Sequence, residues 1–97
     1  MRFEIRERKT VTIREAEVII EPKIGEKEWI VRRRAIMLKG TLELILGSEG
    51  VEFSHLGWQE MSYDRICYRF TIRVPGGTSE ELENFVKEEA KKLGIDI

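Results

Sequence analysis

The stretch ICYRFTIRVPGGTSEELENFVKEEAKKLG, residues 66 to 94, decides the fold. Its first nine residues alternate strictly: apolar residues stand at positions 66, 68, 70, 72 and 74, and Cys, Arg, Thr and Arg stand between them. Because successive side chains of a strand point to opposite faces, this alternation predicts a strand with one core face and one wet face. Pro75 has no amide hydrogen for a sheet ladder, so it ends the predicted strand.

A helix is predicted directly after this strand. Thr78 and Glu81 have the spacing of a capping box, which places the helix start at about Ser79. Acidic residues fill its first turn and lysines its last, as the helix dipole prefers, and Gly94 stands where a left-handed C-cap is needed. Its apolar residues recur at helical spacing and predict one stripe packed on the sheet: Leu82, Phe85, Val86, Ala90 and Leu93.

The chain before residue 66 is interpreted as β structure. Residues 2 to 6 and 11 to 20 alternate, and a change of phase near Arg14 to Glu17 predicts a bulge. Trp29 to Leu38 is predicted as a third strand, although three consecutive arginines interrupt it. Thr41 to Leu46 and Val51 to Phe53 are predicted to form a hairpin, because the glycines in the GSEG connection between them permit positive backbone angles.

These segments together predict an α+β fold in one domain, residues 1 to 97. We expect a strongly bent antiparallel sheet, or a partly open barrel, of about six strands capped by one C-terminal amphipathic helix. The longest irregular connection runs from Ser54 to Glu60.

Composition indicates the cellular compartment and the kind of source organism to expect for this protein. The single cysteine excludes an internal disulfide, and no apolar run reaches the roughly 20 residues that span a bilayer. The charged N-terminus does not resemble a signal peptide, so a soluble, cytoplasmic protein is expected. Charged residues make up 36% of the chain and the only side-chain amides are Gln59 and Asn84, a composition typical of thermophilic proteins.

Charge is distributed unevenly along the chain. The net charge is −1, but residues 76 to 97 carry −3, which leaves +2 for residues 1 to 75. The row Arg65, Arg69 and Arg73 shares one strand face, with successive members about 13 Å apart, so it could meet successive phosphates of nucleic acid or of anionic lipid. The alternative, which the sequence favours, is that glutamates of neighbouring strands neutralise the row: Glu15, Glu17, Glu43 and Glu52.

Trp58 and His55 lie in the longest connection, where binding residues are over-represented. An exposed Trp58 would anchor a partner, whereas tryptophans are buried on average, and burial over the barrel end is the favoured interpretation. His55 is the only histidine and has no cysteine or histidine at metal spacing, so no metal site is expected.

Catalysis is not indicated by any group of residues. Cys67 is predicted on the wet face among arginines, which would increase its reactivity, but no base is predicted near it. The glutamates stand in polar contexts that do not raise their pKa values. We therefore expect a protein that is not an enzyme and that requires no cofactor.

Three segments resemble the consecutive strands of the pleckstrin-homology-like fold, in its bacterial and membrane-associated members. They are Gly40-Thr41-Leu42-Glu43-Leu44, Gly50-Val51-Glu52-Phe53 and Tyr63-Asp64-Arg65-Ile66. That family has seven strands, one more than predicted here. The resemblance implies a non-catalytic binding module for phospholipid headgroups, peptides or other proteins.

The function predicted from the sequence is a binding or adaptor module, with another protein as the first choice of partner. The candidate binding residues are Arg65, Arg69, Arg73, Trp58 and His55. Nucleic acid or anionic lipid is the alternative ligand for the arginine face. A further alternative is a homo-oligomer in which Trp29 to Leu38 pairs edge to edge with a second copy.

Overall fold

The described part of the chain, residues 1–9, 14–61, 65–74 and 80–95 of a computed structural model, contains five strands and two α-helices. In chain order they are β1 (Arg2–Lys9), β2 (Arg14–Glu21), α1 (Glu28–Leu46), β3 (Glu52–Phe53), β4 (Gly57–Met61), β5 (Arg65–Arg73) and α2 (Glu80–Lys92), with a 3₁₀ turn, η1 (Gly47–Glu49), after α1. The predicted α+β class, antiparallel sheet and C-terminal helix are confirmed.

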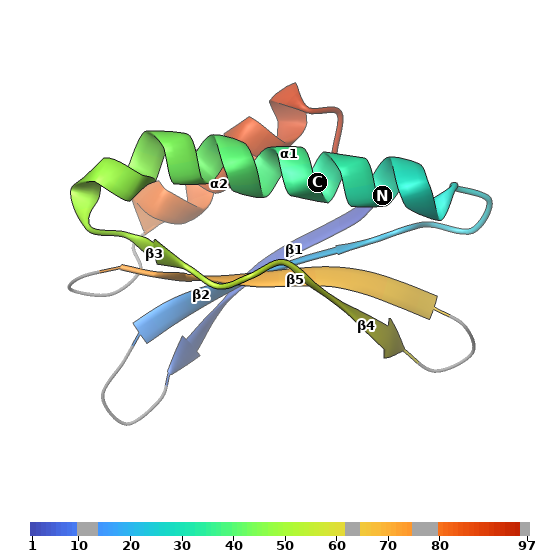
Figure 1. Cartoon of the computed structure of the whole chain (residues 1–97), viewed down its shortest axis with the longest axis horizontal. Helices are drawn as coiled ribbons and strands as arrows, with labels where there is room; N and C mark the ends of the chain where they lie inside the picture. The colour runs from blue at the N-terminus through green and yellow to red at the C-terminus, as the bar shows by residue number, and fades with distance from the viewer. Residues whose placement is uncertain (10–13, 62–64, 75–79, 96–97) are drawn as a thin grey trace.

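The strands form one antiparallel sheet with β2 and β5 at its centre. The order is β1-β2-β5-β3, and β4 also pairs with β5 (Figure 1). Ile5 pairs with Val18, and Val18 pairs in turn with Phe70. The strand predicted at residues 66 to 74 is therefore confirmed, and the structure places it at the centre of the sheet.

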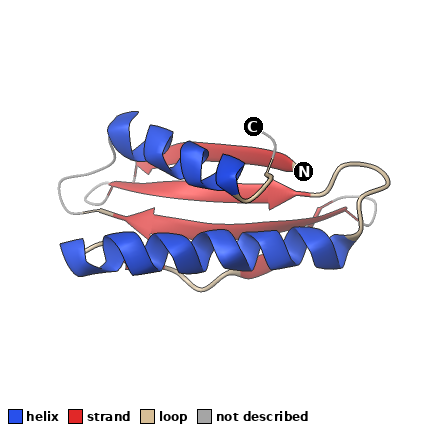
Figure 2. Ribbon diagram, turned by 90° about the horizontal axis from the view of Figure 1, so that it is seen from above, coloured by secondary structure: helices blue, strands red, loops and turns tan. Residues whose placement is uncertain are grey.

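Both helices lie on the same side of the sheet (Figures 1 and 2). The residues of β2 and β5 that face them are fully or almost fully buried and form the core with the inner side of each helix. From the strands these are Ala16, Val18, Ile20, Tyr68, Phe70 and Ile72, and from the helices Val31, Ala35, Leu38, Leu42, Val86 and Ala90. The opposite face of the sheet has no described helix over it, and we call it the open face.

The strands predicted at 29–38 and 41–46 are wrong, because α1 occupies both segments. Its buried residues are spaced as a helix requires: Val31, Ala35, Leu38, Leu42 and Leu46. The helical pattern is hidden in the sequence because the outward side of α1 also carries large apolar residues: Trp29, Ile36, Met37 and Leu44. The predicted hairpin turn at Gly47–Gly50 is likewise wrong, since η1 continues the helical path until Gly50, which has a φ of 79°.

Helix α2 ends as the sequence predicts. Gly94 has a φ of 76°, and the amides of Gly94 and Ile95 donate to the carbonyl oxygens of Lys91 and Ala90, at 2.9 and 3.0 Å. These two bonds make a Schellman motif, which satisfies carbonyls at the helix end. The predicted capping box and Pro75 turn lie outside the described residues, apart from Glu81.

The bulge predicted near Arg14 to Glu17 is wrong. Strands β1 and β2 pair residue for residue from Arg2 opposite Glu21 to Lys9 opposite Arg14. The residues on the other side of the change of phase, Val11 and Ile13, lie outside the described residues.

Candidate functional site

The predicted arginine row lies on the open face of the sheet. Alternation along β5 places Arg69 and Arg73 opposite to the buried Phe70 and Ile72. The side chain of Arg65 lies outside the described residues, although its backbone belongs to β5. Two members of the row can therefore be placed in their surroundings.

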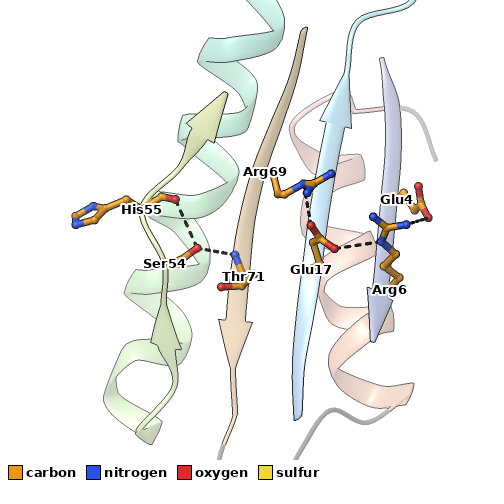
Figure 3. A network of polar contacts seen from close by, with 7 residues as sticks. All are labelled: Glu4, Arg6, Glu17, Ser54, His55, Arg69 and Thr71. Atoms are coloured by element: carbon orange, nitrogen blue, oxygen red, sulfur yellow. Dashed lines mark hydrogen bonds and ion pairs between the residues drawn. The ribbon is translucent and has the colours of Figure 1, made fainter. Parts of the chain in front are cut away.

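Arg69 is tied to a buried carboxylate. Glu17, on the neighbouring strand β2, is only 1% exposed and lies between two arginines on the open face (Figure 3). The Nε of Arg69 lies 2.8 Å from Glu17 Oε1, and Arg6 Nε donates a hydrogen bond of 3.2 Å to Glu17 Oε2. Glu17 thus joins three adjacent strands through ionic contacts.

The remaining described arginines of the open face are also paired. Arg73 lies 3.7 Å from Glu15 and 3.8 Å from Glu52, and Arg2 lies 3.0 Å from Glu21. The ion pairs expected between the arginine row and Glu15, Glu17 and Glu52 are therefore present. The pair expected with Glu43 is wrong, because Glu43 lies on α1 and not on a neighbouring strand. Every arginine on this face whose side chain is described has a carboxylate within ion-pair distance, so these four arginines leave little positive charge for a phosphate.

A bulge at the other edge of β5 determines where Trp58 points. Phe53 pairs with Ile72, and Gly57 pairs with Arg69. The edge segment therefore advances by four residues while β5 advances by three. The backbone amides of Ser54 and Thr71 close this gap: Ser54 donates to the Thr71 carbonyl at 3.0 Å, and Thr71 donates to Ser54 Oγ at 2.8 Å. The extra residue changes the alternation, which puts Trp58 on the helix side of the sheet, opposite Tyr68.

Three of the five predicted site residues gather around one hollow at this edge. A hollow of about 420 Å³ is lined by His55, Trp58 and Arg69 together with Ser54, Gly57, Phe70 and Thr71. The ring of His55 points away from β5 (Figure 3). The favoured burial of Trp58 is wrong, since its side chain is 68% exposed. The main contacts of α1 with the sheet are with β5 and β2 rather than with β4.

Cys67 is fully buried, which corrects its predicted exposure. It lies on the open face, as the alternation predicts, but on the central strand β5, where Arg69 is the next residue on the same face. Within the described residues, no group of three histidine, cysteine, aspartate or glutamate side chains could hold a metal ion.

A second surface was not predicted from the sequence. A groove of about 670 Å³ runs between α1 and the C-terminal end of α2, and we call it the helix groove. Its lining residues are Trp29, Ile30, Arg33, Arg34, Met37, Lys91, Lys92, Leu93 and Gly94. The arginine run at 32 to 34 was the available signal, but it points to this groove only if residues 28 to 46 are interpreted as a helix.

The first turn of α1 is joined to the sheet by a polar contact. The Tyr68 hydroxyl donates a hydrogen bond of 3.1 Å to Glu28 Oε1. Burial of the phenol, together with the hydrogen bond and the negative charge of Glu28, raises the pKa of Tyr68 to about 12. Tyr68 therefore stays protonated and serves as a structural donor.

In comparisons with known proteins, no family model, curated protein or solved structure matches the chain. The resemblance to the pleckstrin-homology-like fold therefore stays a prediction, and one of its three segments, 40–44, lies within α1. Neither described helix has the length and apolar character that a membrane crossing requires.

Proposed function

We propose that the protein is a non-catalytic interaction module that holds another protein at the β3–β4 edge of its sheet. The observation that supports this proposal is the exposed Trp58, which stands beside a hollow on a strand paired with the central β5. A partner would cover the indole and fill the hollow next to it. Tryptophan is enriched among the residues that dominate binding energy at protein interfaces.

The energy available from Trp58 is large for one residue. Covering the exposed two-thirds of an indole would remove roughly 150 Å² from water, worth about 3–4 kcal/mol at 25 cal/mol per Å². The backbone of Trp58 is already ordered by its pairing with Tyr68 in the sheet, and an indole has only two side-chain torsions to order on binding. A rigid aromatic anchor of this kind suits a protein partner.

The charges of the open face favour a protein over nucleic acid or anionic lipid. Arg69 and Arg73 are paired with Glu17, Glu15 and Glu52, and the chain has a net charge of −1. Phosphate-binding surfaces usually carry a clear positive excess. Nucleic acid, lipid and self-association are therefore the alternatives that the experiment must separate.

The test compares Trp58→Ala with a matched control, Leu44→Ala, which removes a side chain that is 84% exposed on α1. The wild type and each variant are immobilised and exposed to extract of the source cells. Any retained protein is then purified, and its affinity for the wild type and for each variant is measured by calorimetry. We expect one partner that binds the wild type and Leu44→Ala equally and binds Trp58→Ala at least about tenfold more weakly, a loss of 1.4 kcal/mol.

Three results would contradict the proposal. The first is a partner that binds Trp58→Ala as tightly as the wild type. The second is salt-sensitive NMR shifts at Arg69 and Arg73 on titration with a single-stranded oligonucleotide, duplex DNA or phosphatidylserine vesicles. The third is a wild-type dimer in sedimentation that Trp58→Ala dissociates, since the edge would then bind a second copy.

A further inference from the structure

The helix groove combines an apolar wall with a rim of one sign of charge. Trp29, Ile30, Met37 and Leu93 supply apolar surface, and Trp29 is 61% exposed. All four charged residues of the lining are cationic: Arg33, Arg34, Lys91 and Lys92. A groove lined by one sign of charge concentrates the field and attracts an opposite charge.

The four cations differ in how far they are already engaged. Arg34 donates to the carbonyl oxygen of Leu93, and Lys92 lies 3.0 Å from Glu89. Within the described ranges, no ion pair or hydrogen bond involves the side chain of Arg33 or of Lys91, and both are exposed. These two side chains line the groove from different helices, Arg33 from α1 and Lys91 from α2, and are available to a ligand.

A hydrogen bond connects the two sides of the groove. Arg34 reaches from α1 to the last turn of α2, where a Cβ on Gly94 would overlap its guanidinium. The absence of a side chain at Gly94 therefore lets Arg34 reach the carbonyl of Leu93 and connect α1 to the chain that follows α2. Arg33 and Lys91 are thus presented on a preformed surface, which lowers the cost of binding.

We infer that the helix groove binds an acidic, amphipathic helical segment of a partner protein. Its apolar side would lie against Trp29 and Met37, and its carboxylates would pair with Arg33 and Lys91. The α1 side of the groove extends from Trp29 to Met37, about 12 Å at 1.5 Å per residue, which accommodates two turns of a bound helix. This site is separate from the Trp58 edge and does not depend on it.

The surroundings favour a short acidic segment over a long polyanion. Helix α2 carries five glutamates outside the groove lining, Glu80, Glu81, Glu83, Glu88 and Glu89, and these would repel a nucleic acid that continued past the groove. Four of the nine lining residues are apolar, which a phosphate backbone would leave uncovered. A helix with one acidic and one apolar side complements both parts of the lining.

The test uses Trp58→Phe as the background, so that Trp29 is the only tryptophan and its fluorescence reports on the groove. The probe is a synthetic peptide of about four helical turns, with leucines at i, i+3, i+4 and i+7 and glutamate at most other positions. We expect a blue shift of Trp29 emission with saturation at micromolar peptide. The control peptide has lysine in place of every glutamate and should cause no shift.

The charge of the groove is then reversed in Arg33→Glu/Lys91→Glu. We expect at least a tenfold weaker affinity, with an unchanged circular dichroism spectrum, because neither side chain has a described ionic partner. Arg32→Glu is the matched control: Arg32 is exposed on the same turn of α1 but does not line the groove, so its effect should stay within about twofold. The affinity of the Trp58→Phe protein should also fall severalfold between low and high salt, which tests the charge contribution without any change in the groove.

Equal binding of the glutamate and lysine peptides, or insensitivity to salt, would overturn the inference. Tighter binding of an oligothymidine than of the acidic peptide would assign the groove to nucleic acid instead. No shift with the acidic peptide at millimolar concentration would also reject the site. Failure here is distinguishable from failure of the Trp58 proposal, because the Trp58→Phe background and the partner titration report on different surfaces.

Discussion

Replacement of Glu17 by glutamine tests whether the open face of the sheet is held together by its ion pairs. Glu17 is 1% exposed and lies between Arg6 on β1 and Arg69 on β5. Glutamine keeps the shape of the side chain and removes its charge. It can still accept a hydrogen bond from one arginine, but its NH₂ group then faces the other guanidinium.

The size of the effect follows from the exposure of the two arginines. Removal of one partner from a fully buried pair costs about 3–5 kcal/mol. Arg69 and Arg6 are 32% and 51% exposed, so water can solvate both once the carboxylate is gone. One hydrogen bond to a charged group is worth about 1.5–3 kcal/mol. We therefore expect the free energy of unfolding to fall by about 2 kcal/mol, which lowers Tm by roughly 10 °C in a domain of this size.

The assay is unfolding in urea, monitored by circular dichroism, and Glu4→Gln is the control. Glu4 is 59% exposed and lies 3.9 Å from Arg6, so its replacement should change stability by less than about 0.5 kcal/mol. A double-mutant cycle with Arg69→Gln should show coupling, since the two residues are in direct contact. If Glu17→Gln lost no more stability than Glu4→Gln, the reasoning about this buried carboxylate would be refuted.

Gly94→Ala should lower the free energy of unfolding by about 1–3 kcal/mol in urea titrations, because Gly94 has a positive φ and the new Cβ would displace Arg34; an unchanged midpoint would contradict this. Gly40→Ala should instead raise it by about 0.5–1 kcal/mol, since Gly40 is inside α1 and a Cβ there would meet open space; a lower midpoint would show that the position is crowded. The Tyr68 phenol should titrate near pH 12 in ultraviolet absorbance rather than near 10. Because folding raises this pKa, the contribution of Tyr68 to stability is complete below pH 10 and is lost between pH 10 and 12. Tyr68→Phe should remove this loss of stability. If the variant lost the same stability between pH 10 and 12, the result would count against the hydrogen bond to Glu28.

The candidate residues were predicted in part because strand alternation is a local property. Alternation alone correctly places Arg69 and Arg73 on one face of the strand and Phe70 and Ile72 on the other. Whether Trp58 is covered depends on where α1 lies, so the sequence could not determine it. The bulge between Phe53 and Gly57 also changes which side of the sheet Trp58 occupies, and it becomes visible only from the register against β5.

The sequence by itself determined strand β5, helix α2 and the left-handed end of that helix at Gly94, because each depends on a period or a single backbone angle that neighbouring residues specify. Only the tertiary structure decided that residues 28 to 46 form a helix. Apolar residues on both sides of α1 hide its period, and burial of Leu38 and Leu42 against the sheet selects the helical conformation. Tertiary structure also decided the charge of the open face, since Arg69 and Glu17 are 52 positions apart in sequence and become partners only when β2 pairs with β5.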